Sequence, residues 1–309
     1  MNNTYTSPKK EYKTSIREID LNGLKAGGES SLNFMHSETQ KISKPLIICE
    51  ILTNIPPNYP QILKDIWGES IYNPVECVKL ALEKNFCALA IKFNIENCED
   101  IDAEIEKSKE QLKEILKLTN LPLFLIGTFR REVDAKLLPE LAKTANRKCT
   151  IGAVEEENFR QIAPIIKEYG HNIIARTPID INLTKQLNIL LTELGFEADN
   201  IIIDPNTGGL GYGLDYAYSI IERIKQAALQ GDTMLNMPVI TFVGEEAWKT
   251  KEAKSNNVPA EWGNMTTRAI SWESITASSM LVSGANIIVM RHPESIKYVQ
   301  KFINKTYQD

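Results

Sequence analysis

The feature that most constrains the fold is a series of eight short apolar runs, rich in Ile, Leu and Val, that recur from residue 46 onward. Within each run the apolar residues follow one another with little alternation, which is typical of strands covered on both faces, as in a parallel sheet. The runs are Leu46–Leu52, Cys87–Phe93, Leu123–Gly127, Cys149–Val154, Asn172–Arg176, Asn200–Asp204, Val239–Val243 and Asn286–Met290.

Helical patterns lie between these runs. In residues 102–118, Ile105, Leu112 and Ile115 fall on one side of a helix, with Glu and Lys on the other. Residues 214–229 show the same division, and residues 270–283 predict a helix of small residues that packs closely on a sheet. Gly195 and Gly284 follow predicted helices, at the position where glycine commonly ends one.

Eight strand–helix units over about 260 residues predict a (β/α)₈ TIM barrel. An open, doubly wound sheet is the alternative, but it rarely runs through eight even units without a switch in the pattern. Residues 1–44 are polar and weakly periodic, and they predict a short N-terminal extension or hairpin that packs on something else. The expected division is therefore an extension, residues 1–44, and a barrel, residues 45–309.

Composition excludes several classes of function. The formal net charge of -5 and the pI near 5.5 give no indication of nucleic-acid or anionic-membrane binding. The apolar runs are too short to cross a bilayer, and the first residues lack the apolar core of a signal peptide, so we expect a cytoplasmic protein. The five cysteines form no C-x-x-C pair, which predicts reduced, buried thiols and no metal site.

Polar residues follow the predicted strands, at the rim where barrel proteins place binding and catalysis. Two connections on this rim are long, residues 53–73 and 244–265. The second contains Trp248 and Trp262, which either form an interface or pack against the barrel's own helices.

The stretch from Asp204 to Tyr216 is the most unusual in the chain. It contains four glycines within six residues, Gly208, Gly209, Gly211 and Gly213, which allow a backbone to approach a ligand or subunit closely. A tight turn is the simpler interpretation, but it needs fewer glycines. The spacing is not that of a dinucleotide-binding loop.

Motifs of the common catalytic classes are missing from the sequence. It contains no P-loop, no H-E-x-x-H and no G-x-S-x-G. The histidines, His36, His171 and His292, are too scattered for a metal triad, and His171 is expected to be structural. We therefore predict no catalytic residue and no metal ligand.

Three long strings in this chain are similar to the small subunit of the corrinoid iron–sulfur protein, also called the acetyl-CoA decarbonylase/synthase delta subunit family. They are WGESIYNPVECVKLAL (residues 67–82), IIDPNTGGLGYGLDYAYSIIERIKQAAL (residues 202–229) and LNMPVITFVGEEAWKTKEA (residues 235–253). The resemblance extends from about residue 45 to residue 303.

The resemblance implies a heterodimer with a large subunit that carries an iron–sulfur cluster and a mobile corrinoid domain. A cobamide (corrinoid), shared with that subunit, lies against the rim of the small subunit's barrel. The complex takes a methyl group from a methyltetrahydrofolate methyltransferase and passes it to acetyl-CoA synthase. The chain lacks clustered cysteines and the D-x-H-x-x-G motif of many cobalamin domains, so we expect the cluster on the partner only and no cobalt ligand here.

The residues expected to bind the cobamide end the predicted strands. Amides, hydroxyls and a guanidinium bond the ring's amide side chains, and glycines allow close approach. The predicted cofactor-binding residues are Asn54, Asn94, Thr128, Arg176, Asn206, Thr207, Gly208 and Gly209.

Two other functions stay open at the level of sequence. One is a stand-alone pterin- or folate-binding methyltransferase barrel, for which Asp204, Asn206, Asn94 and Asn54 are suitable residue types. Such a pocket needs polar groups that converge near the barrel axis with no bulky plug. The other is a purely structural barrel that only holds the partner subunit.

Overall fold

The computed structural model describes residues 10–32, 41–95 and 99–307. Its main sheet has eight parallel strands in the order β8-β7-β6-β5-β4-β3-β10-β9. They are β3 (Leu46–Leu52), β4 (Leu89–Lys92), β5 (Leu123–Ile126), β6 (Thr150–Val154), β7 (Asn172–Arg176), β8 (Ile201–Asp204), β9 (Ile240–Thr241) and β10 (Ile287–Met290).

The two ends of this sheet meet and close it into a barrel. A parallel bridge joins Ile203 to Val239, and the Ile203 amide donates to the Pro238 carbonyl at 2.9 Å. Closure leaves no edge strand in the barrel. The predicted TIM barrel is confirmed.

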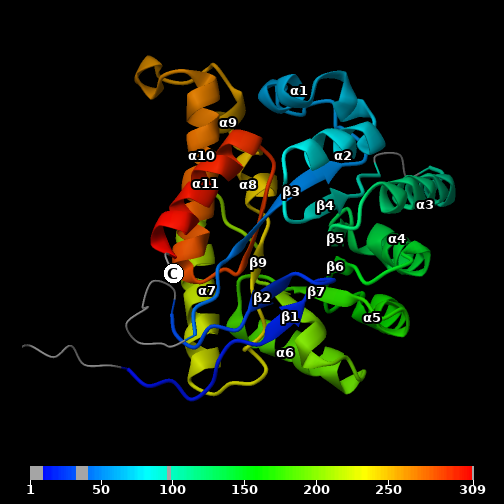
Figure 1. Ribbon diagram of the computed structural model, residues 1–309, viewed down its shortest axis with the longest axis vertical. Helices are drawn as coiled ribbons and strands as arrows, with labels where there is room; N and C mark the ends of the chain where they lie inside the picture. Colours follow the sequence, from blue (N-terminus) through cyan, green and yellow to red (C-terminus); the bar gives the residue numbers. More distant parts are fainter. Residues whose placement is uncertain (1–9, 33–40, 96–98, 308–309) are drawn as a thin grey trace, which may run out of the picture.

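Each strand is followed by a main helix that packs on the outside of the barrel (Figure 1). Asn73, Asp100, Asp180 and Asn264 begin four of these helices, because each side chain accepts hydrogen bonds from free backbone amides of the first turn. The eight helices are α2 (Pro74–Glu83), α3 (Ile101–Leu118), α4 (Arg131–Thr144), α5 (Phe159–Glu168), α6 (Ile181–Glu193), α7 (Leu214–Leu229), α10 (Met265–Ser283) and α11 (Pro293–Thr306).

Alternation along the strands divides the core in two. Residues such as Ile47, Cys49 and Ile51 pack outward against the helices, in the larger apolar cluster. Their neighbours fill the barrel interior, in a separate cluster that includes Ile48, Phe124, Ile174, Ile202 and Val289. The barrel is therefore a packed core with no central channel.

The N-terminal segment closes the floor of the barrel. It forms an antiparallel hairpin of β1 (Glu18–Asp20) and β2 (Lys25–Gly27), drawn in blue in the lower part of Figure 1. Ile19 and Ala26 from the hairpin belong to the interior cluster, and the Asn172 amide donates to the Asp20 carbonyl at 2.8 Å. The apolar side of this predicted extension is thus buried against the barrel itself.

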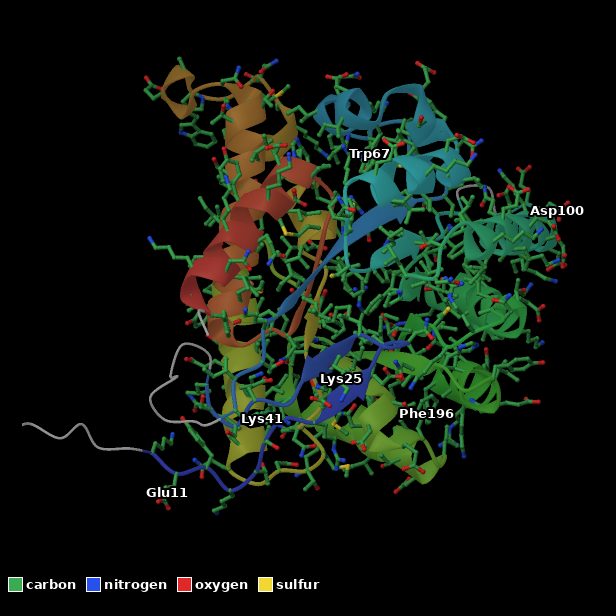
Figure 2. All side chains as sticks on the ribbon, in the orientation of Figure 1. Glu11, Lys25, Lys41, Trp67, Asp100 and Phe196 are labelled. Atoms are coloured by element: carbon green, nitrogen blue, oxygen red, sulfur yellow. The ribbon has the colours of Figure 1, made fainter. Side chains whose placement is uncertain are left out.

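The two long connections contain short helices that the sequence did not predict. The first holds α1 (Gln61–Trp67) and η2 (Gly68–Tyr72), and the second α8 (Val243–Ala247), α9 (Lys251–Lys254) and η4 (Ala260–Trp262). Figure 2 shows Trp67 in the upper part of the molecule, far from Lys25 of the hairpin. The predicted strand 239–243 is correspondingly too long, because α8 already begins at Val243.

His171 serves the fold, as expected. It is buried, its Nδ1 accepts from the Cys149 amide at 3.2 Å, and its Nε2 lies 2.9 Å from the Ala142 carbonyl. The imidazole thereby links the start of β6 to helix α4, and burial lowers its pKa.

Candidate functional site

The interior of the barrel changes from apolar to charged at the carboxyl ends of the strands. On several strands, an inward-facing apolar residue is followed two positions later by a charged residue. Because side chains alternate along a strand, the charged side chain also points inward, into the barrel mouth. Glu245 on helix α8 completes this group, which we call the mouth cluster. The cluster consists of Glu50, Lys92, Arg176, Asp204, Glu245 and Arg291.

Arg291 lies at the centre of one half of the mouth cluster. Its Nε donates to Glu50 Oε2 and its Nη2 to Glu245 Oε2, each at 2.5 Å. Burial alone would lower the pKa of Arg291, but the two carboxylates outweigh it and raise that pKa. Burial likewise opposes ionisation of Glu245, yet Arg291 and Lys92 hold its pKa well below the usual range.

Arg176 and Asp204 form the other half. The Arg176 Nε donates to Asp204 Oδ2 at 2.5 Å, and the Asp204 side chain is completely buried. Burial raises the pKa of Asp204 in spite of the nearby guanidinium. Breaking such a buried pair costs about 3–5 kcal/mol, because one charge is left without compensation.

Lys92 completes the mouth cluster and contacts an aromatic ring. Its Nζ is buried 3.4 Å from Glu245 Oε2 without making a hydrogen bond, and it lies 3.4 Å from the centroid of the Phe129 ring. Burial lowers the pKa of Lys92 to about 8, against the opposing effect of Glu245 and Glu50. Arg176 Cζ lies 3.5 Å from the same ring centroid. Phe129 therefore occupies the mouth of the barrel.

Three of the predicted binding residues lie beside this mouth on neighbouring loops. Asn54 and Asn94 are half-buried and adjacent, since the Asn94 side-chain amide donates to the Asn54 carbonyl at 3.3 Å. Thr128 is half-buried, and its hydroxyl bonds Asp134 Oδ1 at 2.9 Å. The hydroxyl of Thr128 thus helps to shape its own loop.

The glycine stretch folds back upon itself next to β9. Asn206 is exposed, and its side-chain oxygen accepts from the Thr207 amide at 3.0 Å. Thr207 is buried, and its hydroxyl accepts from the Phe242 amide at 2.8 Å. Gly208 and Gly209 are also buried, so the structure leaves Asn206 as the predicted residue of this stretch most open to a ligand.

A small cleft on the rim brings together two of the predicted residues, Arg176 and Asn206. It has a volume of about 240 Å³. The Arg131 side chain spans its acidic side, with its Nε 2.5 Å from Glu155 Oε2. The cleft therefore offers amide, guanidinium and carboxylate groups to a polar ligand. Its lining residues are Arg131, Glu155, Glu156, Glu157, Arg176, Thr177, Pro178, Leu183 and Asn206.

A second hollow lies away from the mouth, on the outer face of helices α7, α10 and α11. It has a volume of about 590 Å³. Ile275, Val282 and Tyr298 line it and are 49%, 41% and 57% exposed. We call it the outer groove. Its other lining residues are Tyr218, Thr267, Ile270, Ser271, Ser274, Ser278 and Ser279.

The two tryptophans of the second long connection have different environments. Trp248 is buried and stacks on His292, with ring centroids 5.8 Å apart. Trp262 is 43% exposed. Trp248 thus packs against the barrel itself, one of the two expectations, while an interface role for Trp262 stays a prediction.

Sequence reasoning missed Phe129 and gave Lys92, Glu50 and Glu245 no role in a shared site. Glu50 interrupts an otherwise apolar strand, which is the one signal that could have marked an inward-facing charge. Phe129 carries no such signal, because its position depends on a left-handed backbone angle, φ 63°.

The described residues contain neither a metal-binding group nor a membrane-spanning helix. No group of His, Cys, Asp and Glu there is arranged to hold a metal ion. None of the helices in the described ranges has the length and apolar character to span a membrane.

Comparison with solved structures shows the fold alone. Dihydropteroate synthase from Xanthomonas albilineans with 4-aminobenzoic acid superposes with a TM-score of 0.61 at 11% identity, over 95% of this chain and all of that one. Dihydropteroate synthase from Stenotrophomonas maltophilia with active site-bound imidazole gives the same score and identity, over 95% and 99% of the two chains.

Comparison of sequences identifies the family. The acetyl-CoA decarbonylase/synthase complex subunit delta of Archaeoglobus fulgidus is 29% identical over 96% of this chain and 69% of its own length. Subunit delta 1 of Methanosarcina thermophila is 27% identical over 94% and 70%. The family model of the CO dehydrogenase/acetyl-CoA synthase delta subunit matches residues 22–303, and the chain accordingly belongs to that family.

Proposed function

We propose that this chain is the small subunit of a heterodimeric corrinoid iron–sulfur protein. That protein would carry a methyl group from methyltetrahydrofolate:corrinoid methyltransferase to acetyl-CoA synthase in the reductive acetyl-CoA pathway. The names of its relatives support membership of an acetyl-CoA decarbonylase/synthase complex. The observation that carries the proposal is the filled barrel mouth, where Phe129 lies between Lys92 and Arg176 and leaves the rim as the surface that meets a cofactor.

In this proposal the rim covers the face of a cobamide held by the large subunit. The rim has the right donor set, because corrin amide side chains need amide and guanidinium partners. Asn206 is exposed and Arg176 lines the cleft beside it, while Asn54 and Asn94 are half-buried at the mouth. Thr128, Thr207 and Gly208 shape the loops that position them, and Gly209 lies in the same loop without a close contact.

We assign neither the cobalt nor the iron–sulfur cluster to this chain. His292, which follows β10, is buried and stacks on Trp248, and its Nδ1 accepts from the Glu294 amide at 3.1 Å. The cysteines of the sequence lack the spacing of cluster ligands. The cluster and the cobalt contacts therefore belong to the large subunit in our proposal.

The outer groove is the surface that we assign to the large subunit. Ile275 and Val282 form an apolar ridge on α10, and Tyr298 of α11 faces the same hollow. Serines beside the ridge let a partner helix approach closely. Contiguous apolar surface of this kind marks a protein interface on a soluble molecule. An apolar helical face of the large subunit is the matching occupant.

The test is to co-express the full chain with its large subunit and record the visible spectrum of what co-purifies. We expect the chain alone to be colourless and the pair to show corrinoid and iron–sulfur bands. Ile275→Glu and Val282→Glu should each weaken the pairing about tenfold or more, because a carboxylate is buried without a partner.

Tyr169→Glu is the matched control. Tyr169 is also a large exposed side chain, 45% exposed, but it lies at the end of α5. The Tyr169→Glu variant should pair with the large subunit as the wild type does. Equal loss with Tyr169→Glu, or no loss with the groove variants, would contradict the assignment of the groove. A second variant, Asn206→Gly, keeps the left-handed backbone and should shift the corrinoid bands of the pair if the rim covers the cobamide.

The stand-alone pterin- or folate-binding methyltransferase remains the alternative. Phe129 at the mouth counts against it, because such a pocket needs converging polar groups with no bulky plug, and Asp204 already pairs with Arg176. Micromolar binding of methyltetrahydrofolate to the chain alone would favour this alternative over our proposal.

A further inference from the structure

Phe129 lies between two cations. Lys92 Nζ and Arg176 Cζ lie 3.4 and 3.5 Å from its ring centroid. At these distances each group must stand almost directly above the ring, because a tilted approach would collide with the ring carbons. Two groups above one face would overlap, so the cations occupy opposite faces. This is the cation–π arrangement by which proteins hold an aromatic ring, here on both sides at once.

The loop that carries Phe129 is built to hold it there. Asp134 accepts from the Thr128 amide at 2.7 Å and from the Phe129 amide at 2.9 Å. Gly127 is required beneath that carboxylate, since a Cβ at this position would lie 2.5 Å from Asp134 Oδ1. Phe129 has φ 63°, a left-handed angle that costs a bulky residue about 1 kcal/mol or more.

Two polar groups of the mouth cluster lack hydrogen-bond partners. Lys92 Nζ and Glu50 Oε1 are both buried without a hydrogen-bond partner. Phe242 borders the ring edge-on, with centroids 5.4 Å apart. The mouth thus contains a cation on each face of the Phe129 ring and the Phe242 ring at its edge. The mouth cluster also holds a carboxylate oxygen, Glu50 Oε1, that accepts no hydrogen bond.

We propose that the barrel mouth is a binding site for a flat, electron-rich aromatic ring with a hydrogen-bond donor on its edge, and that Phe129 is its built-in occupant. The side chain denies this site to small aromatic molecules. The proposal goes beyond the function proposed above and does not depend on it, since it concerns this chain without any partner.

The test uses the full chain with Phe129→Gly, which removes the ring and suits the left-handed backbone. The probe is phenol, whose hydroxyl supplies the edge donor. We expect saturable binding by calorimetry with Kd on the order of 0.1 to 1 mM, given the size of the ligand. The wild-type chain should bind no phenol below about ten times that concentration.

Two controls distinguish recognition of an aromatic ring from the filling of an apolar cavity. Cyclohexanol has the same size and hydroxyl but no π face, and it should bind Phe129→Gly at least about fivefold more weakly. Adding Lys92→Met should weaken phenol binding by a similar factor. Circular dichroism confirms that each variant is folded.

Three results would overturn the proposal: no phenol binding by folded Phe129→Gly, equal binding of phenol and cyclohexanol, or equal binding of phenol by the wild type. Pairing of Phe129→Gly with the large subunit is measured separately. Intact pairing with any of these results leaves the proposed function standing and removes only this inference.

Discussion

At the scale of single residues, His292 shows how burial fixes a protonation state. Its ring stacks almost parallel on Trp248, with an interplanar angle of 10°, and its Nδ1 caps helix α11. Burial lowers the pKa of His292 to about 4, although the charge of Glu294 opposes the shift. The neutral imidazole is thus the form that the folded chain prefers.

Because the pKa of His292 is lowered in the folded chain, the contribution of His292 to stability decreases as the pH falls. The unfolded chain binds a proton at His292 below about pH 6.5, whereas the folded chain binds it only near pH 4. Neutral His292 therefore contributes to the free energy of unfolding above pH 6.5, and this contribution is lost as the pH falls from 6.5 toward 4. Urea unfolding of the wild type and of His292→Asn, which keeps a capping acceptor, measures it between pH 7.5 and 4.5.

The difference between the two proteins is the informative quantity, because other groups also titrate in this range. Glu273, whose Oε2 accepts from the His292 amide, has a pKa raised by burial and acts in the opposite direction. His292→Asn should lose less stability than the wild type as the pH falls. Parallel curves for the two proteins would show that His292 does not titrate as described.

At the scale of elements, the glycine stretch illustrates how one sequence signal admits two interpretations. A Cβ on Gly208 would lie 2.1 Å from the Gly213 carbonyl oxygen, within the same loop. A Cβ on Gly209 would meet nothing closer than 3.6 Å. Gly208 is thus needed for the fold of the loop, while Gly209 leaves room for a side chain.

Gly208→Ala should lower the free energy of unfolding by about 2 kcal/mol or more, because backbone must move to admit the methyl group. Gly209→Ala is the matched control and should change it by less than about 0.5 kcal/mol. Chemical denaturation checks both. A similar loss in the two variants would mean that the close contact of Gly208 with the Gly213 carbonyl does not set the difference between them.

The sequence was sufficient to predict the eight parallel strands and the barrel, because burial on both faces leaves a direct mark on composition. Strand β3 has the predicted bounds, whereas β9 is three residues shorter than predicted (two residues against five). The mouth cluster could not be predicted. Which charges meet there depends on which strands face one another across the closed barrel, and no local pattern records that.

At the scale of the whole molecule, a buried ionic contact ties the N-terminal segment to the barrel. Lys225 Nζ on α7 bonds Glu29 Oε1, and the Asn286 amide donates to the same oxygen at 2.8 Å. The side chains of Lys225 and Glu29 are 1% and 6% exposed. Glu29 thus joins the N-terminal segment both to α7 and to Asn286, which directly precedes β10.

Glu29→Ala should destabilise the chain by about 3 kcal/mol or more, because Lys225 stays buried without its carboxylate. Glu18→Ala is the control within the same segment. Its partner Lys25 is 66% exposed, so its loss should cost less than about 1 kcal/mol. Thermal unfolding of both variants tests the contrast, and equal effects would contradict the importance of burial at Glu29.

The hairpin that closes the barrel floor has a consequence for the order of events during synthesis. Residues near position 14 leave the ribosome early, yet Thr14 donates to the carbonyl of Ala228, 214 positions later in the chain. Glu29 accepts from Asn286, which lies 257 positions later. Contacts of such long sequence separation form slowly, because the intervening chain must first be ordered. Docking of the N-terminal segment thus requires residues that are translated late, and we expect the floor of the barrel to close only when translation is nearly complete.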